Sequence, residues 1–275
     1  MANEPIRIDD ADDPRVAEFR NIRERDLTGR RGRFIAEGTV VLRMLAAAHE
    51  RDGAFVAEKI LLLENRMAGL ADELAAFPAE VPVYVAGSAV LDAIAGFHLH
   101  RGVLALGRRR LQPDMATLMS AMPETSLVVM AAGISNHDNI GSIFRNAAAF
   151  GTDAVILDEA CCDPLYRKAI RVSVGAVLKV PYAQGGTIED NLALLLGHGF
   201  DVWALSPSGR TEMRRIVPTR RMALVTGTEG TGLHSSILER FNTARIAQAP
   251  GLDSLNAATA TGIALYEIAS AQGRL

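Results

Sequence analysis

Apolar positions along the chain follow two periods, one typical of buried strands and the other of amphipathic helices. In the second half, short apolar runs predict strands at residues 127–132, 153–157, 177–180, 201–206 and 222–226. Helical spacing predicts helices at 115–121, 140–150, 167–173, 188–197 and 254–271. Strands that alternate with helices favour a parallel sheet covered on both faces, with ligands beyond the carboxyl ends of the strands.

The first half shows a shorter alternation of the same kind. Residues 34–50 have helical spacing, with Val40, Val41, Met44, Leu45 and Ala48 expected on one face. Strands are predicted at 59–63, 81–85 and 102–106, and helices at 68–76 and 89–95. Three arginines at 108–110, followed by a Pro-Asp pair, indicate an exposed linker. We therefore predict an α/β protein with domains at 1–108 and 124–275, joined by a linker at 109–123.

Composition narrows the class of protein. The chain has 275 residues, of which 49% are apolar and 22% charged, and its net charge is −3. This balance is typical of a globular protein and gives no overall basic field. The N-terminus is unlike a signal peptide, and no apolar run reaches the roughly 18 residues of a membrane span. Cys161 and Cys162 are adjacent and lack zinc-site spacing. We expect a cytoplasmic protein with free thiols, no metal and no membrane segment.

The first of three motifs covers residues 136–146 and lies between a predicted strand and a predicted helix. Asp138 is expected to cap that helix by accepting hydrogen bonds from its free amides. Asn139, Ser142 and Asn146 then form a polar row on one face, and Arg145 flanks it. A solvated helix face with an ordinary cap explains the same pattern.

The second motif, T-G-T-E-G-T-G at residues 226–232, follows an apolar strand. Its glycines allow a sharp turn and a close approach of the backbone to a ligand. It lacks the Lys-Ser/Thr pair of a phosphate-binding loop and the GxGxxG spacing of a dinucleotide site. The Glu229 carboxylate would repel a pyrophosphate, so hydroxyls, an amine or a positive sulfonium suit the loop better. A plain glycine turn is the alternative.

The third motif covers residues 246–256 and leads into the last helix through Pro250 and Gly251. Asp253 or Ser254 is expected to cap that helix, with Asn256 in its first turn. Simple capping explains this motif equally well.

Together the motifs resemble those of the SpoU (TrmH-like) family of RNA 2′-O-methyltransferases, within the trefoil-knotted SPOUT class. The matching residues are Asn139, Gly141 and Arg145 in the first motif, Gly227, Glu229, Gly230 and Gly232 in the second, and Ser254, Leu255 and Asn256 in the third. The resemblance covers the chain from Leu127 to its end. Residues 33–38 and 102–105 resemble the ribosomal-protein-like RNA-binding domain that some members carry at the N-terminus. Ala247 and Gln248 depart from the Pro-Met that is common in the third motif.

The resemblance implies a knotted methyltransferase domain that uses S-adenosylmethionine to methylate a ribose 2′-hydroxyl in RNA. The implied catalytic residues are Arg145, Asn139, Glu229, Ser254 and Asn256, and the implied cofactor-binding residues are Gly227, Ile246 and Leu255. A guanidinium almost never loses its proton, so Arg145 is expected to stabilise charge and to bind phosphate rather than to act as a base. The family also implies a homodimer whose active site draws on both chains. The last helix, with Ile263, Leu265, Tyr266 and Ile268, is its candidate interface, and packing within the chain is the alternative.

Local basic clusters offer phosphate contacts to an RNA partner. They comprise Arg20, Arg23, Arg25, Arg30, Arg31 and Arg33, then Arg108–Arg110, and finally Arg214, Arg215, Arg220 and Arg221. Few aromatic residues accompany them, which favours recognition of RNA shape and backbone. The N-terminal domain favours ribosomal RNA over transfer RNA. A nucleotide-dependent Rossmann enzyme would need a glycine-rich turn after residue 132, which is absent from the sequence, and a non-catalytic RNA-binding or ribosome-assembly factor is the other alternative.

Overall fold

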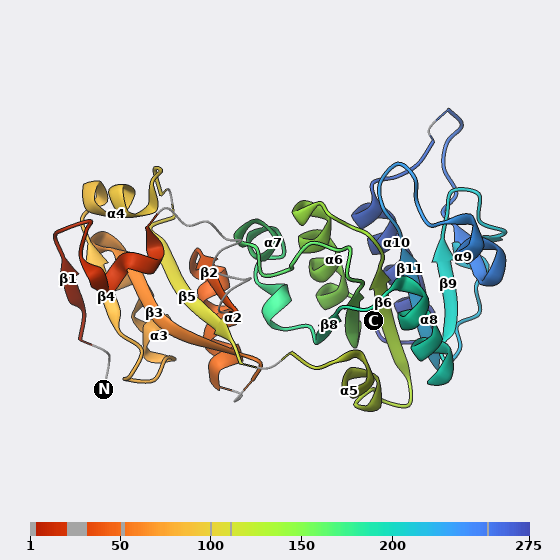
Figure 1. Cartoon of the computed structure of the whole chain (residues 1–275), viewed down its shortest axis with the longest axis horizontal. Coiled ribbons are helices and arrows are strands. Elements are labelled where there is room, and N and C mark those ends of the chain that lie inside the picture. The colour runs from red at the N-terminus through yellow and green to blue at the C-terminus, as the bar shows by residue number, and fades with distance from the viewer. Residues whose placement is uncertain (1–3, 21–31, 51–52, 100, 111, 252) are drawn as a thin grey trace. The chain divides into compact units, whose positions relative to one another are not determined.

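The computed structural model describes residues 4–20, 32–50, 53–99, 101–110, 112–251 and 253–275. The chain forms two compact units (Figure 1). Unit 1 contains residues 1–111 and the later segment 165–179, and unit 2 contains residues 112–164 and 180–275. Each unit has its own sheet and its own core.

Unit 1 is built on a mixed sheet. Its strands are β1 (Ile6–Ile8), β2 (Arg33–Glu37), β3 (Phe55–Leu63), β4 (Val83–Ala86) and β5 (Val103–Arg109), in the order β1-β4-β3-β5-β2. The β1–β4 and β4–β3 pairs are parallel, and β5 runs antiparallel to β3 and β2. The helices are η1 (Pro14–Phe19), α2 (Thr39–Glu50), η2 (Glu64–Arg66), η3 (Ala68–Leu70), α3 (Ala71–Ala75), α4 (Ser88–Ala95), α7 (Arg167–Val172) and η4 (Ala176–Leu178).

Two predictions for unit 1 were wrong at their boundaries. The helix expected over residues 34–50 is the strand β2 followed by α2, and Gly38, with a φ of +93°, makes the turn between them. Four consecutive side chains from Phe34 to Glu37 are buried, which a half-exposed helix would not allow. On α2 itself, Val40 is 51% exposed, so the buried face is shifted to Val41, Leu42 and Leu45.

Two of the three arginines that were expected in a linker belong to the sheet instead. Arg108 and Arg109 are the last residues of β5, where they pair in register with β2 and β3. Glu58 on β3 accepts a hydrogen bond from Arg108 Nε at 2.7 Å, so a neighbouring carboxylate makes the arginine compatible with a strand.

Unit 2 is built on a parallel sheet. Its strands are β6 (Ser126–Ala131), β7 (Ala154–Leu157), β8 (Tyr182–Gln184), β9 (Asp201–Leu205), β10 (Thr211–Glu212), β11 (Arg221–Thr226) and β12 (Asn242–Arg245), in the order β10-β12-β9-β11-β6-β7-β8. The helices are α5 (Met115–Ser120), α6 (His137–Ala149), α8 (Ile188–Gly197), η5 (Met213–Arg215), α9 (Ser235–Arg240) and α10 (Ala257–Ala271).

Helices cover both faces of the parallel sheet, as the sequence predicts. Val128 and Met130 on β6 join the core beneath α5, α8 and α9. Their neighbours Leu127 and Val129 are equally buried and point to the opposite face, where α6 and α10 pack against each other (Figure 1). Burial on both faces explains why these strands read as continuous apolar runs.

Several expectations for unit 2 need correction. The strand expected at 177–180 is replaced by the helix η4, which belongs to unit 1, and the strand β8 lies just after it. The elements β10, α9 and β12 were not predicted. The cap of α6 is Asn136, whose Oδ1 accepts from the amide of Asp138, so Asp138 lies in the first turn. The cap of α10 is Asn256, rather than Asp253 or Ser254.

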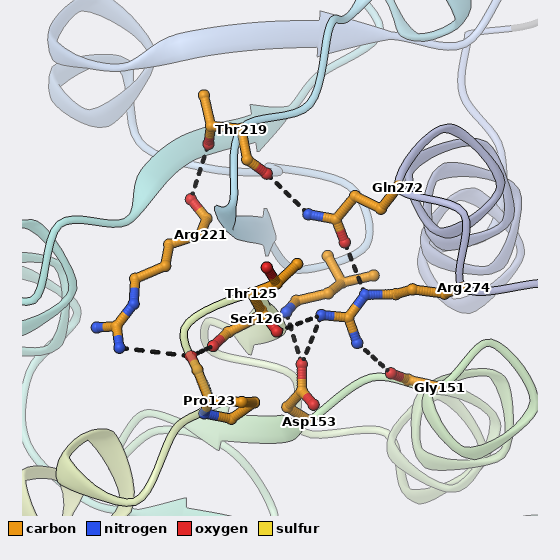
Figure 2. Close-up of polar contacts among 10 residues, drawn as sticks. Pro123, Thr125, Ser126, Gly151, Asp153, Thr219, Arg221, Gln272 and Arg274 are labelled. Atoms are coloured by element: carbon orange, nitrogen blue, oxygen red, sulfur yellow. Dashed lines mark hydrogen bonds and ion pairs between the residues drawn. The ribbon is translucent and has the colours of Figure 1, made fainter.

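Hydrogen bonds and an ion pair connect the residues after α10 to the amino ends of the central strands (Figure 2). Arg274 forms an ion pair with Asp153 at 2.9 Å and donates to the carbonyl oxygens of Gly151 and Thr125. Gln272 accepts from Arg274 Nε and donates to the carbonyl of Thr219. The Arg274 side chain is only 16% exposed, so these bonds are largely shielded from water.

We expect Arg274→Ala to lower the free energy of unfolding of unit 2 by about 2 kcal/mol, because it leaves a half-buried carboxylate and two carbonyls without their cation. Urea unfolding followed by the fluorescence of Trp203, the single tryptophan, on β9, measures this change. Arg220→Ala is the matched control, since Arg220 pairs with Glu124 in the open, at 76% and 78% side-chain exposure. Equal effects of the two substitutions would contradict the assignment.

Candidate active site

A pocket of about 380 Å³ lies beyond the carboxyl ends of β9, β11 and β12. Four segments form most of its lining: residues 205–207 at the end of β9, the glycine loop 226–233 at the end of β11, residues 244–248 at the end of β12, and residues 254–257 at the start of α10. Leu238 on α9 and Ala260 on α10 complete it. This volume is within the range of about 300–1,000 Å³ typical of small-molecule sites. The position agrees with the general rule for parallel sheets.

The glycine loop doubles back on itself tightly. A Cβ on Gly227 would lie 2.7 Å from the carbonyl carbon of Gly232, so only glycine permits this approach. The amide of Gly232 donates to the carbonyl of Thr228 at 3.1 Å, and the hydroxyls of Thr228 and Thr231 lie 2.8 Å apart. The loop therefore holds a fixed shape and presents the exposed Glu229 at its tip.

Asn256 connects three elements of the site. Its Oδ1 accepts from the amides of Ala258 and Thr259, which caps α10. Its Nδ2 donates to Asn139 Oδ1 on α6 at 2.9 Å and to Glu229 Oε1 in the glycine loop at 2.5 Å. One side chain thus uses its acceptor for local structure and its donor for a bridge between the first and second motifs.

The polar row of α6 faces protein rather than solvent. Asn139 is 4% exposed, and its Nδ2 is buried without a hydrogen-bond partner among the described residues. Asn146 donates to the carbonyl of Ala258 on α10. A Cβ on Gly262 would lie 2.7 Å from Asn146 Nδ2, so this glycine lets the two helices approach closely. The solvated-face alternative is therefore wrong for Asn139 and Asn146.

Arg145 differs from the other predicted site residues. Six of them line the pocket: Gly227, Glu229, Ile246, Ser254, Leu255 and Asn256. Asn139 reaches the pocket through Asn256. Arg145 is not part of the lining; its side chain is exposed and has no hydrogen bond or ion pair with any described residue. A single chain therefore assembles the predicted cofactor-binding residues but leaves Arg145 outside their pocket.

Sequence reasoning missed two parts of the lining. Ser206 and Pro207 follow β9, and their position after a strand was a signal that could have revealed them. Gln248 was noted only as a departure from the family pattern, and it lines the pocket. The loop after β9 lies beside the end of β12, where the amide of Ser206 donates a hydrogen bond to the carbonyl of Ala244. No signal in the sequence indicated this contact.

The basic clusters suggested for RNA contact are largely engaged by acidic side chains. Arg33 and Arg108 both bind Glu58 at 2.7 Å, and Arg20 binds Asp12. In the later clusters, Arg214 and Arg215 pair with Glu212, and Arg220 pairs with Glu124. Arg23, Arg25, Arg30 and Arg31 lie outside the described residues. Arg214, Arg215 and Arg220 are 69%, 74% and 76% exposed, so their pairs are weak and phosphates can compete for them, whereas Arg33 and Glu58 are only 21% and 18% exposed.

The cysteines are free and suited to packing rather than reaction. Cys161 is buried after β7, and its thiol donates to the carbonyl of Ala131. Burial and the nearby Asp158 raise the pKa of the Cys161 thiol, and burial raises the pKa of Cys162 to about 11, so both stay protonated near neutrality. Within the described ranges, no group of three or more His, Cys, Asp or Glu side chains could hold a metal ion. No helix there is long and apolar enough to cross a membrane.

Comparison with known proteins identifies the family. Residues 126–266 match the SpoU rRNA Methylase family. A protein of Mycobacterium bovis, named as an uncharacterized tRNA/rRNA methyltransferase, is 39% identical and the match covers 94% of this chain and 89% of that protein. A 23S rRNA (guanosine-2′-O-)-methyltransferase of Yersinia pestis is 29% identical over 76% of this chain and 86% of that protein. The chain therefore belongs to the SpoU family of RNA methyltransferases.

Solved structures share the fold along nearly the whole chain. An AdoMet-bound rRNA methyltransferase from Sinorhizobium meliloti superposes with a TM-score of 0.77 at 25% identity, covering 98% of both chains. An RNA 2′-O ribose methyltransferase superposes with a TM-score of 0.79 at 24% identity, covering 99% of this chain and 100% of that one. The α/β fold with a parallel sheet is therefore that of SpoU methyltransferases.

The bridge made by Asn256 can be tested separately from its cap. Asn256→Asp keeps an oxygen that can cap α10 but replaces the Nδ2 donor with a carboxylate beside Glu229. We expect repulsion to lower the free energy of unfolding by about 1 kcal/mol near neutral pH. Salt screens the repulsion between the two exposed carboxylates, so the loss shrinks at about 1 M salt. Trp203 fluorescence in urea measures both values.

Asn256→Ala is the control, because it removes cap and bridge without adding charge. Its loss of stability relative to the original protein should differ little between low and high salt. A loss in Asn256→Asp that does not change with salt would show that the side chain does not face Glu229.

Proposed function

We propose that this protein transfers a methyl group from S-adenosylmethionine to a ribose 2′-hydroxyl of RNA, with ribosomal RNA favoured over transfer RNA. The observation that carries the proposal is the pocket that gathers the second and third motifs, bridged to the first by Asn256. A non-catalytic RNA-binding protein has no need of this arrangement.

The pocket residues fit the methyl donor. Glu229 offers a carboxylate to a positive sulfonium or ammonium group. Ile246 and Leu255 supply apolar walls, and the turn at Gly227 brings backbone close to the cavity. The buried Oε1 of Gln248 has no partner among the described residues, and a ligand in this pocket would provide one. Size, apolar surface and polar groups all suit an adenosine linked to an amino acid.

The chemistry requires alignment and charge stabilisation more than acid–base catalysis. When bound, S-adenosylmethionine would supply a methyl carbon on a positive sulfur. The ribose oxygen would bond to this carbon as the carbon–sulfur bond breaks, S-adenosylhomocysteine would leave, and the hydroxyl proton would pass to water. Asn139, Glu229, Ser254 and Asn256 are proposed to shape the site by hydrogen bonds, so that the reactants can be held in line. Arg145 stays charged, so it stabilises the developing alkoxide and binds the neighbouring phosphate.

We further propose that the protein is a homodimer and that Arg145 acts at the partner's pocket. The position of Arg145 outside its own chain's pocket lining supports this division. On α10, Leu265 and Ile268 are buried within the chain, so of the expected interface residues only Ile263 and Tyr266, which are 37% and 53% exposed, remain available. Leu265 and Ile268 therefore pack within the chain, which was the alternative to an interface. The interface is proposed for Ile263 and Tyr266 alone.

Unit 1 is proposed to bind RNA. The domains are proposed to divide as residues 1–108 and 124–275 around a linker, except that residues 165–179 group with unit 1. Support for a ribosomal RNA target comes from the printed names of the family and of relatives such as the 23S rRNA enzyme of Yersinia pestis. A reducing cytoplasm suits both the substrate and the two free thiols.

The first experiment incubates the protein with methyl-labelled S-adenosylmethionine and unmodified ribosomal or transfer RNA. We expect label in ribosomal RNA, recovered as a 2′-O-methyl nucleoside that protects the adjacent phosphodiester from alkali. A fully 2′-deoxy version of the labelled region should accept none, because it lacks the nucleophile. Label on a base would contradict ribose specificity. RNA binding without cofactor binding would favour the assembly-factor alternative.

Arg145→Ala should abolish turnover while leaving S-adenosylhomocysteine binding within a few-fold, since the residue lies outside the pocket. Survival of activity within a few-fold would overturn its role. Glu229→Ala should also be inactive. Mixing the two variants and allowing subunits to exchange should restore about a quarter of the original activity, because half of the dimers then carry one intact composite site. No recovery, with exchange verified by light scattering and a size tag, would place Arg145 at its own chain's site.

A further inference from the structure

Gln248 carries an unused hydrogen-bonding atom inside the pocket. Its Oε1 is buried, and no described residue donates to it. The residue lies on the loop after β12, two positions beyond Ile246, and it contributes to the pocket lining. A buried amide oxygen without a donor is unfavourable in the empty protein, so a ligand that donates to it gains affinity.

The neighbours of Gln248 define which part of a ligand it meets. The loop after β9 lies against the end of β12, where Leu205 pairs with Ala244. Pro207, Ile246 and Leu238 add further apolar surface to the lining. The charged and amide groups of the pocket come instead from the β11 loop and the start of α10, where Glu229 and Asn256 bond to each other. We therefore expect an apolar part of the ligand at the side of the pocket formed by β9 and β12, where the Gln248 loop begins, and a charged part near Glu229.

We infer that the Gln248 side chain recognises the adenine of the methyl donor and is a specificity-determining residue, an inference that rests on the proposed function. A carboxamide presents one acceptor and one donor side by side. Adenine offers the complementary pair, an exocyclic amine next to a ring nitrogen, and glutamine binds this base in that bidentate manner elsewhere. The amine would donate to the buried Oε1. The charged amino-acid end of the donor would lie toward Glu229.

The test compares two ligands and two proteins by titration calorimetry. The ligands are S-adenosylhomocysteine and its purine analogue, which lacks only the 6-amino group. We expect the original protein to bind the analogue about tenfold more weakly, the effect of one lost hydrogen bond in a shielded site. Gln248→Met keeps the length of the side chain and removes its polar atoms. This variant should bind S-adenosylhomocysteine about tenfold more weakly and distinguish the two ligands by less than about twofold.

Gln112→Met is the matched control, because Gln112 is exposed and does not line the pocket. It should bind and discriminate like the original protein, and the urea midpoint of each variant reports intact folding. If Gln248→Met keeps the original discrimination, the adenine assignment is overturned while the proposed function stands. If the original protein binds neither ligand, the proposed function fails as well.

Discussion

The candidate site depends on the hydrogen bonds that the Asn256 side chain makes. This side chain lies at the point where α10 begins, and its two functional atoms have different tasks. The oxygen satisfies amides that every helix leaves free at its start, and the nitrogen bridges Asn139 to Glu229. The separations along the chain are 117 and 27 residues. Residues this distant keep a fixed geometry only if the elements carrying them pack rigidly, which the close contact of Asn146 with Gly262 allows between α6 and α10.

The sequence predicts those features that depend on local pattern. Buried strands and the helices between them follow from periodicity, and the carboxyl ends of parallel strands locate the glycine loop. Errors occurred where tertiary contacts override the pattern. The run from Phe34 to Glu37 has ambiguous spacing, and its pairing with β5 makes it a strand. Residues 177 and 178 belong to η4 rather than to a strand, because Gly175, with a φ of +83°, precedes a new helical turn there.

The site residues also fall into two groups: those that the local sequence predicts and those whose role depends on tertiary packing. Glycines and acids in a motif can be recognised because their chemistry is local, whereas the partner of Asn139 depends on the packing of two helices. The cap at Asn256 also shows the limit of local rules. Asp253, Ser254 and Asn256 are all good capping residues, and sequence preference alone does not choose among them. The choice falls on the residue whose nitrogen has partners on α6 and in the glycine loop.

The pocket and Arg145 place two different demands on the chain. Binding a small ligand requires a concave pocket that buries much of the ligand surface, and loops at one edge of the sheet in a single chain provide it. Holding an RNA phosphate requires an accessible cation, which closure of such a cavity would bury at high cost. Arg145, on the exposed side of α6, avoids that cost because its guanidinium is open to water. The proposed homodimer would satisfy both demands, because each α6 would then present its arginine to the pocket of the partner.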